Sequence, residues 1–277
     1  MTQSNGSSNS NASGSRQLAV VTGASSGIGL ELAKVFAQHG YDVVVAAEDA
    51  ELDGAAGQVR ALGADVTPVR VDLATTQGVE QLAQRVQALG RPVDALALNA
   101  GVGLGGPFLE QPVDKIFNLI DLNVRGTVYL GRLLMPAMVA RKQGRVLVTS
   151  SIAALVPGAF SAVYNASKSF LQSWSEAVRN EIKDSGVTVT ALQPGATDTE
   201  FFDRSGQVQQ HTKVAESKKD SPADVAKDGF EAMMAGKDHV VAGAFKNKVQ
   251  AALSEALPDT VTAQQHRKMA EPGSASK

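Results

Sequence analysis

The feature that most restricts the fold of this chain is an apolar run followed at once by a glycine turn and a helix. Residues 18–22 are apolar except for a final Thr, and residues 23–29 read Gly-Ala-Ser-Ser-Gly-Ile-Gly. Glycines at such a turn let the backbone approach a pyrophosphate, and the following helix offers unpaired N–H groups to hold it. The pattern predicts the first unit of a nucleotide-binding α/β fold, with a plain tight turn as the alternative.

Strand and helix patterns alternate along most of the remaining chain. Apolar runs predict strands, and amphipathic stretches that end near a glycine predict helices. The expected strands cover residues 18–22, 42–46, 66–71, 93–99, 145–149, 188–193 and 240–241; after a first helix that Gly40 ends, the expected helices cover residues 50–62, 77–88, 114–141 and 164–183, with a later one starting at Ser221. Strands that are apolar throughout indicate burial on both faces. We predict a single doubly wound, Rossmann-type α/β domain whose mostly or wholly parallel sheet of about seven strands is flanked by helices on both faces.

The two ends of the chain differ in composition from this central part. Residues 1–17 are almost all Ser, Asn, Gly, Thr and Gln, which predicts a flexible tail. The Rossmann domain is expected to cover residues 18–245, and its polar segment at residues 199–221 is expected to be a mobile cover for the substrate. Residues 246–277 are expected to form a C-terminal helix up to residue 257 and a tail that is loose from residue 270.

Charge and composition argue against several classes of protein. The net charge is -2 and no basic run is longer than a pair such as Lys218-Lys219, so no nucleic-acid partner is expected. The chain has no cysteine, which excludes disulfides, thiolate metal sites and a cysteine nucleophile and is compatible with the cytoplasm. No metal site is expected. No membrane span is expected either, since no apolar run approaches the roughly 18 residues that a bilayer requires.

A tyrosine and a lysine four positions apart form a candidate acid–base pair. Tyr164 and Lys168 share one face of an expected helix, and Ser151 lies thirteen positions before the tyrosine. A positive charge within about 4–6 Å favours the phenolate and lowers the pKa of a tyrosine from its usual ~10. Taken alone, such a pair is more often a half-buried ring beside a surface charge, so its meaning depends on the other motifs.

The order and spacing of these motifs resemble the short-chain dehydrogenase/reductase family. The resemblance covers roughly residues 18–241 and rests first on the glycine turn, Ser151 and the Tyr164-x-x-x-Lys168 motif. Further matches, all in the family's order, are Asp72-Leu73, Asn99-Ala100-Gly101, Asn123, Pro194-Gly195, Thr197 and Thr199. A second glycine sequence at residues 101–106 fits G-x-G-x-x-G literally, but Pro107 and the polar residues after it do not open a helix, so we reject it as the phosphate turn.

The resemblance implies an NAD(P)-dependent oxidoreductase that interconverts a small-molecule ketone or aldehyde and an alcohol. It implies that Tyr164 is the acid/base and that Ser151 bonds the same substrate oxygen, with Ser150 as the competing serine. It further implies that Lys168 lowers the Tyr164 pKa and binds the nicotinamide ribose, and that Asn123 holds a water; the alternative for Asn123 is bonding to the helix backbone. The implied cofactor contacts are Gly23, Ser25, Ser26, Gly27, Ile28, Gly29, Glu48, Asp72, Leu73, Asn99, Ala100, Gly101, Tyr164, Lys168, Pro194, Gly195, Thr197 and Thr199.

The choice between NAD(H) and NADP(H) depends on two positions. Relatives that prefer NADP place a cation before the second turn glycine or after the second strand, where it pairs with the 2′-phosphate. Those positions hold Ser26 and Glu48 here. A carboxylate would repel the phosphate, so the sequence favours NAD(H), although NAD-preferring relatives carry their acid one position earlier, at Ala47. Alternatively, Glu48 begins the next helix, where an acid suits the helix dipole.

Two other functions are compatible with the same fold. A non-catalytic nucleotide sensor or scaffold is one, and the complete set of Asn123, Ser151, Tyr164 and Lys168 counts against it. An epimerase or dehydratase is the other, but the residues after Pro194 look too few for the larger substrate domain of such enzymes.

Apolar residues outside these motifs suggest a substrate site and a subunit interface. By position in the family, residues 156–160 and the segment from Phe201 and Phe202 are expected to line an apolar-walled site; for the two phenylalanines, anchoring to the core is an equal alternative. A homodimer or homotetramer is expected, because two helices carry more apolar surface than one sheet face needs. The residues concerned are Val124, Val128, Leu130, Leu133, Leu134, Phe170, Leu171 and Trp174.

Overall fold

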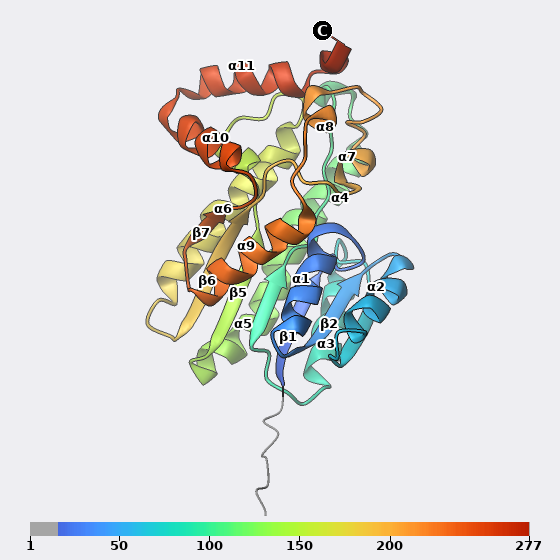
Figure 1. The fold of residues 1–277 in the computed structure, drawn as a ribbon, viewed down its shortest axis with the longest axis vertical. Helices are drawn as coiled ribbons and strands as arrows, with labels where there is room; N and C mark the ends of the chain where they lie inside the picture. Colours follow the sequence, from blue (N-terminus) through green and yellow to red (C-terminus); the bar gives the residue numbers. More distant parts are fainter. Residues whose placement is uncertain (1–15, 277) are drawn as a thin grey trace, which may run out of the picture.

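One sheet of parallel strands forms the centre of the molecule (Figure 1). The computed structural model describes residues 16–276, apart from the side chain of Glu255. The strand order is β3-β2-β1-β4-β5-β6-β7, and every neighbouring pair is parallel. The strands are β1 (Gln17–Thr22), β2 (Tyr41–Ala47), β3 (Val66–Arg70), β4 (Ala95–Leu98), β5 (Gly144–Thr149), β6 (Val187–Gln193) and β7 (His239–Val241). The predicted doubly wound fold is confirmed.

Helices cover both faces of this sheet, and the strands alternate their side chains between the two layers. Ala19 and Val21 of β1 pack into one core, whereas Leu18 and Val20 pack into the other. The first core contains helices α1 (Gly27–Gln38), α2 (Glu51–Arg60) and α9 (Pro222–Met234); the second contains α3 (Thr76–Gln87), α5 (Thr127–Arg141) and α6 (Ala162–Glu181).

The strand order reverses between β1 and β4, and this reversal positions the candidate site. From β1 the chain moves outward through β2 to β3, and it then returns to β4 and moves outward in the other direction. The loops at the carboxyl ends of β1 and β4 therefore diverge and leave a crevice, which is where ligands bind in sheets of this kind.

The helix at residues 114–141, which the sequence predicts as either long or broken, is broken, and the apolar surface is smaller than expected. The expected helix at residues 114–141 consists of α4 (Val113–Ile120), a π-helical turn (Asp121–Gly126) and α5. The expected surplus of apolar surface is smaller than predicted, because Leu130, Leu134 and Leu171 are buried within the chain's own core. Of the residues named for an interface, Phe170 is exposed.

The chain ends of the domain are also more structured than predicted. Strand β1 starts at Gln17, and Arg16 forms an ion pair with Asp42 at 3.2 Å. Arg16 and Gln17 therefore belong to the domain and not to the tail. The rest of the expected N-terminal tail, residues 1–15, lies outside the described residues.

At the C-terminal end, α10 (Phe245–Ala256) matches the predicted helix and a further helix, α11 (Asp259–Ala270), follows it. The expected loose end is wrong for residues 271–276. The backbone N–H of Gly273 donates to the carbonyl of Gln210 at 2.7 Å, and that of Ala275 donates to His211 at 3.0 Å. These partners are more than 60 residues away in sequence, so a local pattern does not reveal them. None of the helices described has the length and apolar character needed to cross a bilayer.

Candidate active site

A cavity of about 730 Å³ lies at the carboxyl edge of the sheet and collects residues from distant parts of the chain. Every cofactor contact expected from the sequence lines it, and so does Ser151. Asn123 is the exception among the expected site residues, because its side chain is buried behind the cavity. Within residues 16–276, no group of three or more His, Asp or Glu side chains could hold a metal ion.

The glycine turn after β1 forms a cradle that side chains would fill. Gly23 and Gly27 have φ of 64° and 53°, in the left-handed region that favours glycine. A Cβ on Gly29 would lie 1.9 Å from the carbonyl oxygen of Gly23. Helix α1 begins directly after this turn, its N-cap Ser26 makes no side-chain cap bond, and its first turn has no acidic residue. The cradle and the free helix N-terminus fit a pyrophosphate of a dinucleotide.

Side-chain hydrogen bonds hold the ends of β1, β4 and β5 together below the cavity. The hydroxyl oxygen of Thr22 accepts from the backbone N–H groups of Asn99 and Ala100, at 2.9 and 3.0 Å. The Asn99 amide donates to the Thr22 carbonyl at 3.1 Å and accepts from the Thr149 hydroxyl at 3.0 Å. The expected Asn99-Ala100-Gly101 motif therefore fixes the floor of the crevice.

The end of β2 brings two acidic residues to the cavity, and sequence reasoning singled out only one of them. Glu48 is exposed, and its backbone carbonyl accepts from Arg70 at 3.0 Å. Asp49 accepts a hydrogen bond from Ser25 of the glycine turn at 2.9 Å through Oδ2, while its Oδ1 is buried without a partner. The sequence signal that could have identified Asp49 is the pair of adjacent acidic residues directly after a strand. The unpaired oxygen of Asp49 fits a ribose hydroxyl.

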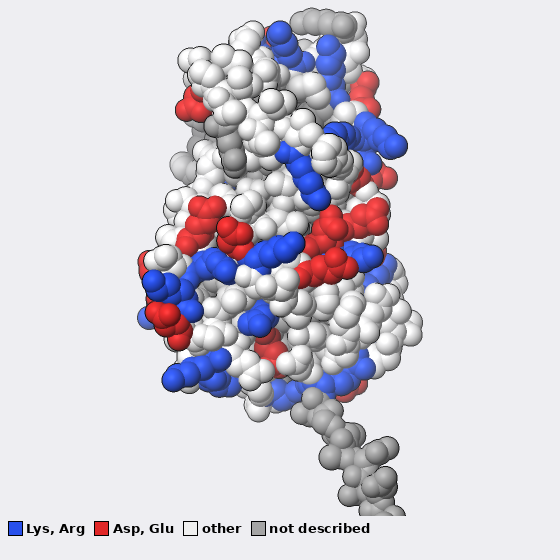
Figure 2. All heavy atoms as spheres, turned by 60° about the vertical axis from the view of Figure 1, so that its left-hand side comes forward, with Lys and Arg blue, Asp and Glu red and all other residues white. Residues whose placement is uncertain are grey.

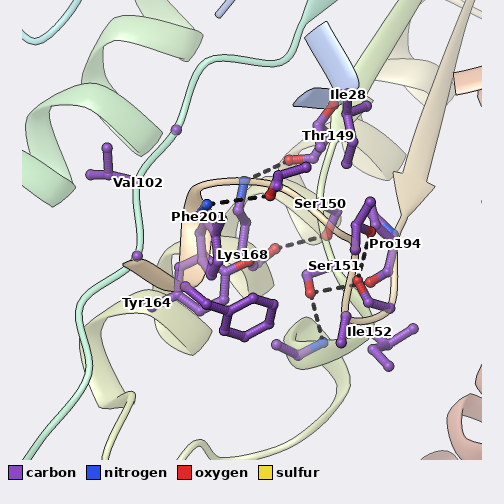
Figure 3. A pocket seen from close by; sticks show the side chains of 18 of the residues that line it. Ile28, Val102, Thr149, Ser150, Ser151, Ile152, Tyr164, Lys168, Pro194 and Phe201 are labelled. Atoms are coloured by element: carbon purple, nitrogen blue, oxygen red, sulfur yellow. Dashed lines mark hydrogen bonds between the residues drawn. The ribbon is translucent and has the colours of Figure 1, made fainter. Parts of the chain in front are cut away.

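The proposed reacting groups lie close together on α6 and after β5 (Figure 3). The Ser151 hydroxyl lies beside the Tyr164 phenol, donates to the Pro194 carbonyl at 3.4 Å and accepts from the backbone N–H of Ala153 at 3.1 Å. The ammonium of Lys168 is 5.9 Å from the centre of the Tyr164 ring and donates to the Thr149 carbonyl at 2.8 Å. The competing Ser150 points away and donates to the Lys168 carbonyl at 3.2 Å.

Burial, rather than the lysine charge, dominates the acidity of this tyrosine. Desolvation raises the pKa of Tyr164 to about 12, and the hydrogen bond with Ser151 acts in the opposite direction. Desolvation also lowers the pKa of Lys168 to about 8. The pKa of Tyr164 in the protein alone therefore lies above its usual value and not below it, contrary to what the spacing of Tyr164 and Lys168 predicts. The Tyr164 ring is partly accessible from the cavity, although it is buried from the outer surface of the protein.

Asn123 lies in the π-helical turn, where its side chain bridges two segments. Its carbonyl oxygen accepts from the backbone N–H of Val102 at 2.8 Å, and its amide donates to the Val102 carbonyl and to the Ser167 hydroxyl, both at 3.0 Å. These bonds join the loop after β4 to α6. The Asn123 side chain therefore positions other segments. It bonds to backbone groups, as the alternative reading expects, but these groups belong to a neighbouring loop and not to its own helix.

The segment at residues 199–221 covers one side of the cavity and contains helices α7 (Phe201–Arg204) and α8 (Lys213–Glu216). Phe202 is buried, whereas Phe201 stacks beside Tyr164 with ring centres 5.1 Å apart. The glycine sequence that we rejected as a phosphate turn supports this segment. A Cβ on Gly103 would lie 2.4 Å from the Phe201 ring, and one on Gly105 would lie 2.5 Å from Gln207.

Sequence reasoning predicted α10 but missed α11. The two helices form a hairpin that lines the cavity. It contributes Val249, Leu253, His266 and Met269 to the lining. Helix α11 also contacts the loop that precedes α6, because His266 bonds the Ala159 carbonyl at 2.9 Å.

The chain belongs to the short chain dehydrogenase family, whose profile matches residues 17–210. Among its relatives, retinol dehydrogenase 8 of Bos taurus is 34% identical over 71% of this chain and 63% of that protein. The chain spans about three fifths of the length of several curated relatives, 60% in one case and 62% in another.

Solved structures of the same family have the same architecture. A short-chain dehydrogenase from Sphingobium yanoikuyae in complex with NADPH has a TM-score of 0.75 and 27% identity, covering 81% of this chain and 87% of that one. A short chain dehydrogenase/reductase from Burkholderia phymatum in complex with NAD has a TM-score of 0.78 and 26% identity, covering 90% and 95%. The matched profile ends before α10 and α11, so this hairpin lies outside it.

Proposed function

We propose that this protein is a nicotinamide-dependent reductase or dehydrogenase that interconverts a ketone or aldehyde and an alcohol. The observation that carries the proposal is the grouping of Tyr164, Ser151 and Lys168 in one cavity, with the Lys168 ammonium 5.9 Å from the centre of the Tyr164 ring. A hydroxyl pair at this position binds one carbonyl oxygen from two directions. Bound nicotinamide would supply or accept the hydride.

The raised pKa of Tyr164 favours its action as a general acid. With a pKa of about 12 the phenol is protonated at neutral pH, and it donates its proton to the substrate oxygen as negative charge develops there. Ser151 donates a second hydrogen bond to the same oxygen. In the oxidation direction the phenolate form accepts the proton, and the Lys168 ammonium stabilises that form.

Lys168 has two tasks in this proposal. Its pKa of about 8 leaves the ammonium largely charged at pH 7, where it stabilises the phenolate that forms on Tyr164 after proton transfer. Its side chain lines the cavity next to Gly101, so it also reaches a ribose hydroxyl of a dinucleotide held by the glycine turn.

We further propose a preference for NAD(H) over NADP(H), supported by the two carboxylates at the end of β2. Asp49 accepts from the ribose 2′-hydroxyl through its unpaired oxygen, and the neighbouring Glu48 repels a 2′-phosphate. Arg204 lies 3.9 Å from Asp49 but is also paired with Glu200, so its charge is partly compensated.

A substrate screen tests the proposed function directly. The purified chain is incubated with a panel of ketones, aldehydes and alcohols, and absorbance at about 340 nm reports NADH or NADPH turnover. We expect turnover of at least one apolar ketone, faster with NADH than with NADPH. Tight NADH binding without turnover of any member of the panel would instead support a nucleotide sensor.

A further inference from the structure

The hairpin of α10 and α11 forms a wall of the cavity that carries apolar side chains and polar ones, among the latter Gln250, Ser254, Thr262, Gln265 and His266. Val249 and Leu253 of α10 and Met269 of α11 line the cavity although 41–56% of each side chain's surface is exposed. Ile152 and Val156, which follow β5, also line the cavity, and so does Phe201 of the covering segment. The apolar side chains on all these sides favour a bulky, largely apolar substrate.

One polar ring stands in this wall, and its hydrogen bonding fixes its tautomer. Nδ1 of His266 lies 2.9 Å from the Ala159 carbonyl oxygen, which can only accept, so Nδ1 carries the proton. Burial lowers the pKa of His266 below its usual value, so the ring is neutral near pH 7. In a neutral ring with a protonated Nδ1, the other nitrogen, Nε2, is an acceptor.

Nε2 of this histidine is accessible and free for a ligand. Among the described residues it has no hydrogen-bond partner, and it is not one of the buried polar atoms that lack one. The ring also lines the cavity. A second contact helps to fix the orientation of the ring, since the next residue, Arg267, lies 5.2 Å above the ring of Phe160, which follows Ala159.

Building on the proposed function, we propose that His266 is a specificity residue whose Nε2 accepts a hydrogen bond from a hydroxyl group on the substrate body. The substrate class is then a bulky apolar ketone, or the corresponding alcohol, that carries a second hydroxyl away from the reacting carbon. Ala159 lies five residues before Tyr164, so the same hydrogen bond also connects α11 to the loop that leads into the helix of Tyr164.

A matched pair of ketones measures this contact. Phenylcyclohexanone and its para-hydroxyphenyl counterpart share the reacting carbonyl and differ by one hydroxyl. Their dissociation constants are measured calorimetrically with excess NAD⁺ present, so that the ketone is not consumed. We expect the hydroxylated ketone to bind roughly 3–10-fold more tightly to the wild-type protein. Equal affinities, or no binding of either ketone, would overturn the inference.

Two substitutions separate substrate recognition from a merely structural role. The amide nitrogen of His266→Asn replaces Nδ1 and keeps the bond to Ala159, but nothing replaces Nε2, so the preference for the hydroxylated ketone should disappear. The amide of His266→Gln reaches the position of Nε2, so part of the preference should return. The opposite pattern, with preference kept in the Asn variant and lost in the Gln variant, would show that His266 only holds the loop.

A matched control is available at the other end of the chain. His39 also has its Nδ1 within 2.8 Å of a backbone carbonyl, that of Val35, but it is exposed and does not line the cavity. His39→Asn should leave the ratio of the two dissociation constants unchanged. A change of equal size in this variant would contradict the assignment to His266.

The tautomer itself gives a readout that needs no substrate. Nitrogen-15 NMR at pH 7 should show His266 protonated on Nδ1 alone, with the signal assigned by its loss in His266→Asn. Protonation on Nε2 would overturn the proposal. Reduction of both ketones with no hydroxyl preference would remove this inference and leave the oxidoreductase function intact, whereas tighter binding of the hydroxylated ketone without reduction of either would do the reverse.

Discussion

At the scale of single residues, the environment of a side chain changes its chemistry more than its spacing in sequence suggests. The i, i+4 spacing brings Tyr164 and Lys168 onto one helix face, but the ammonium bonds the Thr149 carbonyl and burial governs both groups. The pair therefore holds a protonated phenol beside a lysine whose pKa is lowered. This combination suits proton donation to a carbonyl.

The lowered pKa of Lys168 makes a prediction about stability. The folded pKa of about 8 lies below the unfolded value of 10.5, so between these values the unfolded chain binds more protons. The free energy of unfolding of the nucleotide-free protein should therefore rise with pH across this window, by on the order of a few kcal/mol. Lys168→Met should remove that rise, as measured by urea unfolding at a series of pH values. An equal rise in the variant would show that other groups cause it.

The two acids after β2 predict the cofactor preference. Glu48→Arg should shift binding toward NADPH by about 1–3 kcal/mol, because a charge-assisted hydrogen bond to the 2′-phosphate replaces a repulsion. Asp49→Ala should weaken NADH binding, since the ribose loses its acceptor. Fluorescence titration with both nucleotides measures the ratio of dissociation constants. A ratio unchanged in Glu48→Arg would mean that this side chain points away from the ribose.

At the scale of secondary-structure elements, two glycine-rich segments serve different partners. The turn at residues 23–29 lines the cavity, whereas residues 103–106 leave space for side chains of the covering segment. The π-helical turn places Asn123 between the loop after β4 and α6. The cavity walls are thus held in place by the close approach of the glycine segments to their neighbours and by the buried side-chain amide of Asn123.

Gly103→Ala tests the contact between these elements. Its Cβ would lie 2.4 Å from the Phe201 ring, so that ring must move from its place beside Tyr164. We expect kcat/KM to fall by roughly 10-fold or more, because small displacements of substrate-positioning groups are costly. Gly57→Ala in α2 is the control, since a Cβ there meets no atom within 4 Å and alanine favours helix. Equal activities of both variants would contradict the role of Phe201.

The elements that the sequence predicts well are those with a local signal. The strands, the glycine turn and the helix of Tyr164 follow from apolar runs and capping glycines, and the fold follows from their alternation. The place of α10 and α11 along the cavity and the bond from Gly273 to Gln210 were not predicted, because such contacts depend on residues distant in sequence. The tautomer of His266 likewise depends on a carbonyl more than 100 residues away.

At the scale of the whole molecule, one surface is left unusually apolar. Helix α4 packs against α6, and the two present apolar side chains to the outside. The exposed residues on and beside them are Phe108, Leu109, Val113, Phe117, Ile120 and Phe170. Over the face shown in Figure 2, Lys and Arg are interspersed with Asp and Glu.

We predict that this apolar surface is the interface of a homodimer or a larger homo-oligomer. Phe117 is 60% exposed, so Phe117→Glu should dissociate the assembly without unfolding the subunit. Light scattering at micromolar concentration measures the mass, and circular dichroism checks the fold. A monomeric mass for the wild-type protein would contradict the prediction.

The central claim is that Tyr164 is the acid of a carbonyl reductase, and the kinetics of Tyr164→Phe on the best substrate of the screen test it most directly. The substitution removes one oxygen, keeps the ring against Phe201, and leaves Lys168 in place. We predict that kcat and kcat/KM both fall by about 10²–10⁴-fold, while the NADH dissociation constant changes by no more than a few-fold. Wild-type turnover in Tyr164→Phe would contradict the account.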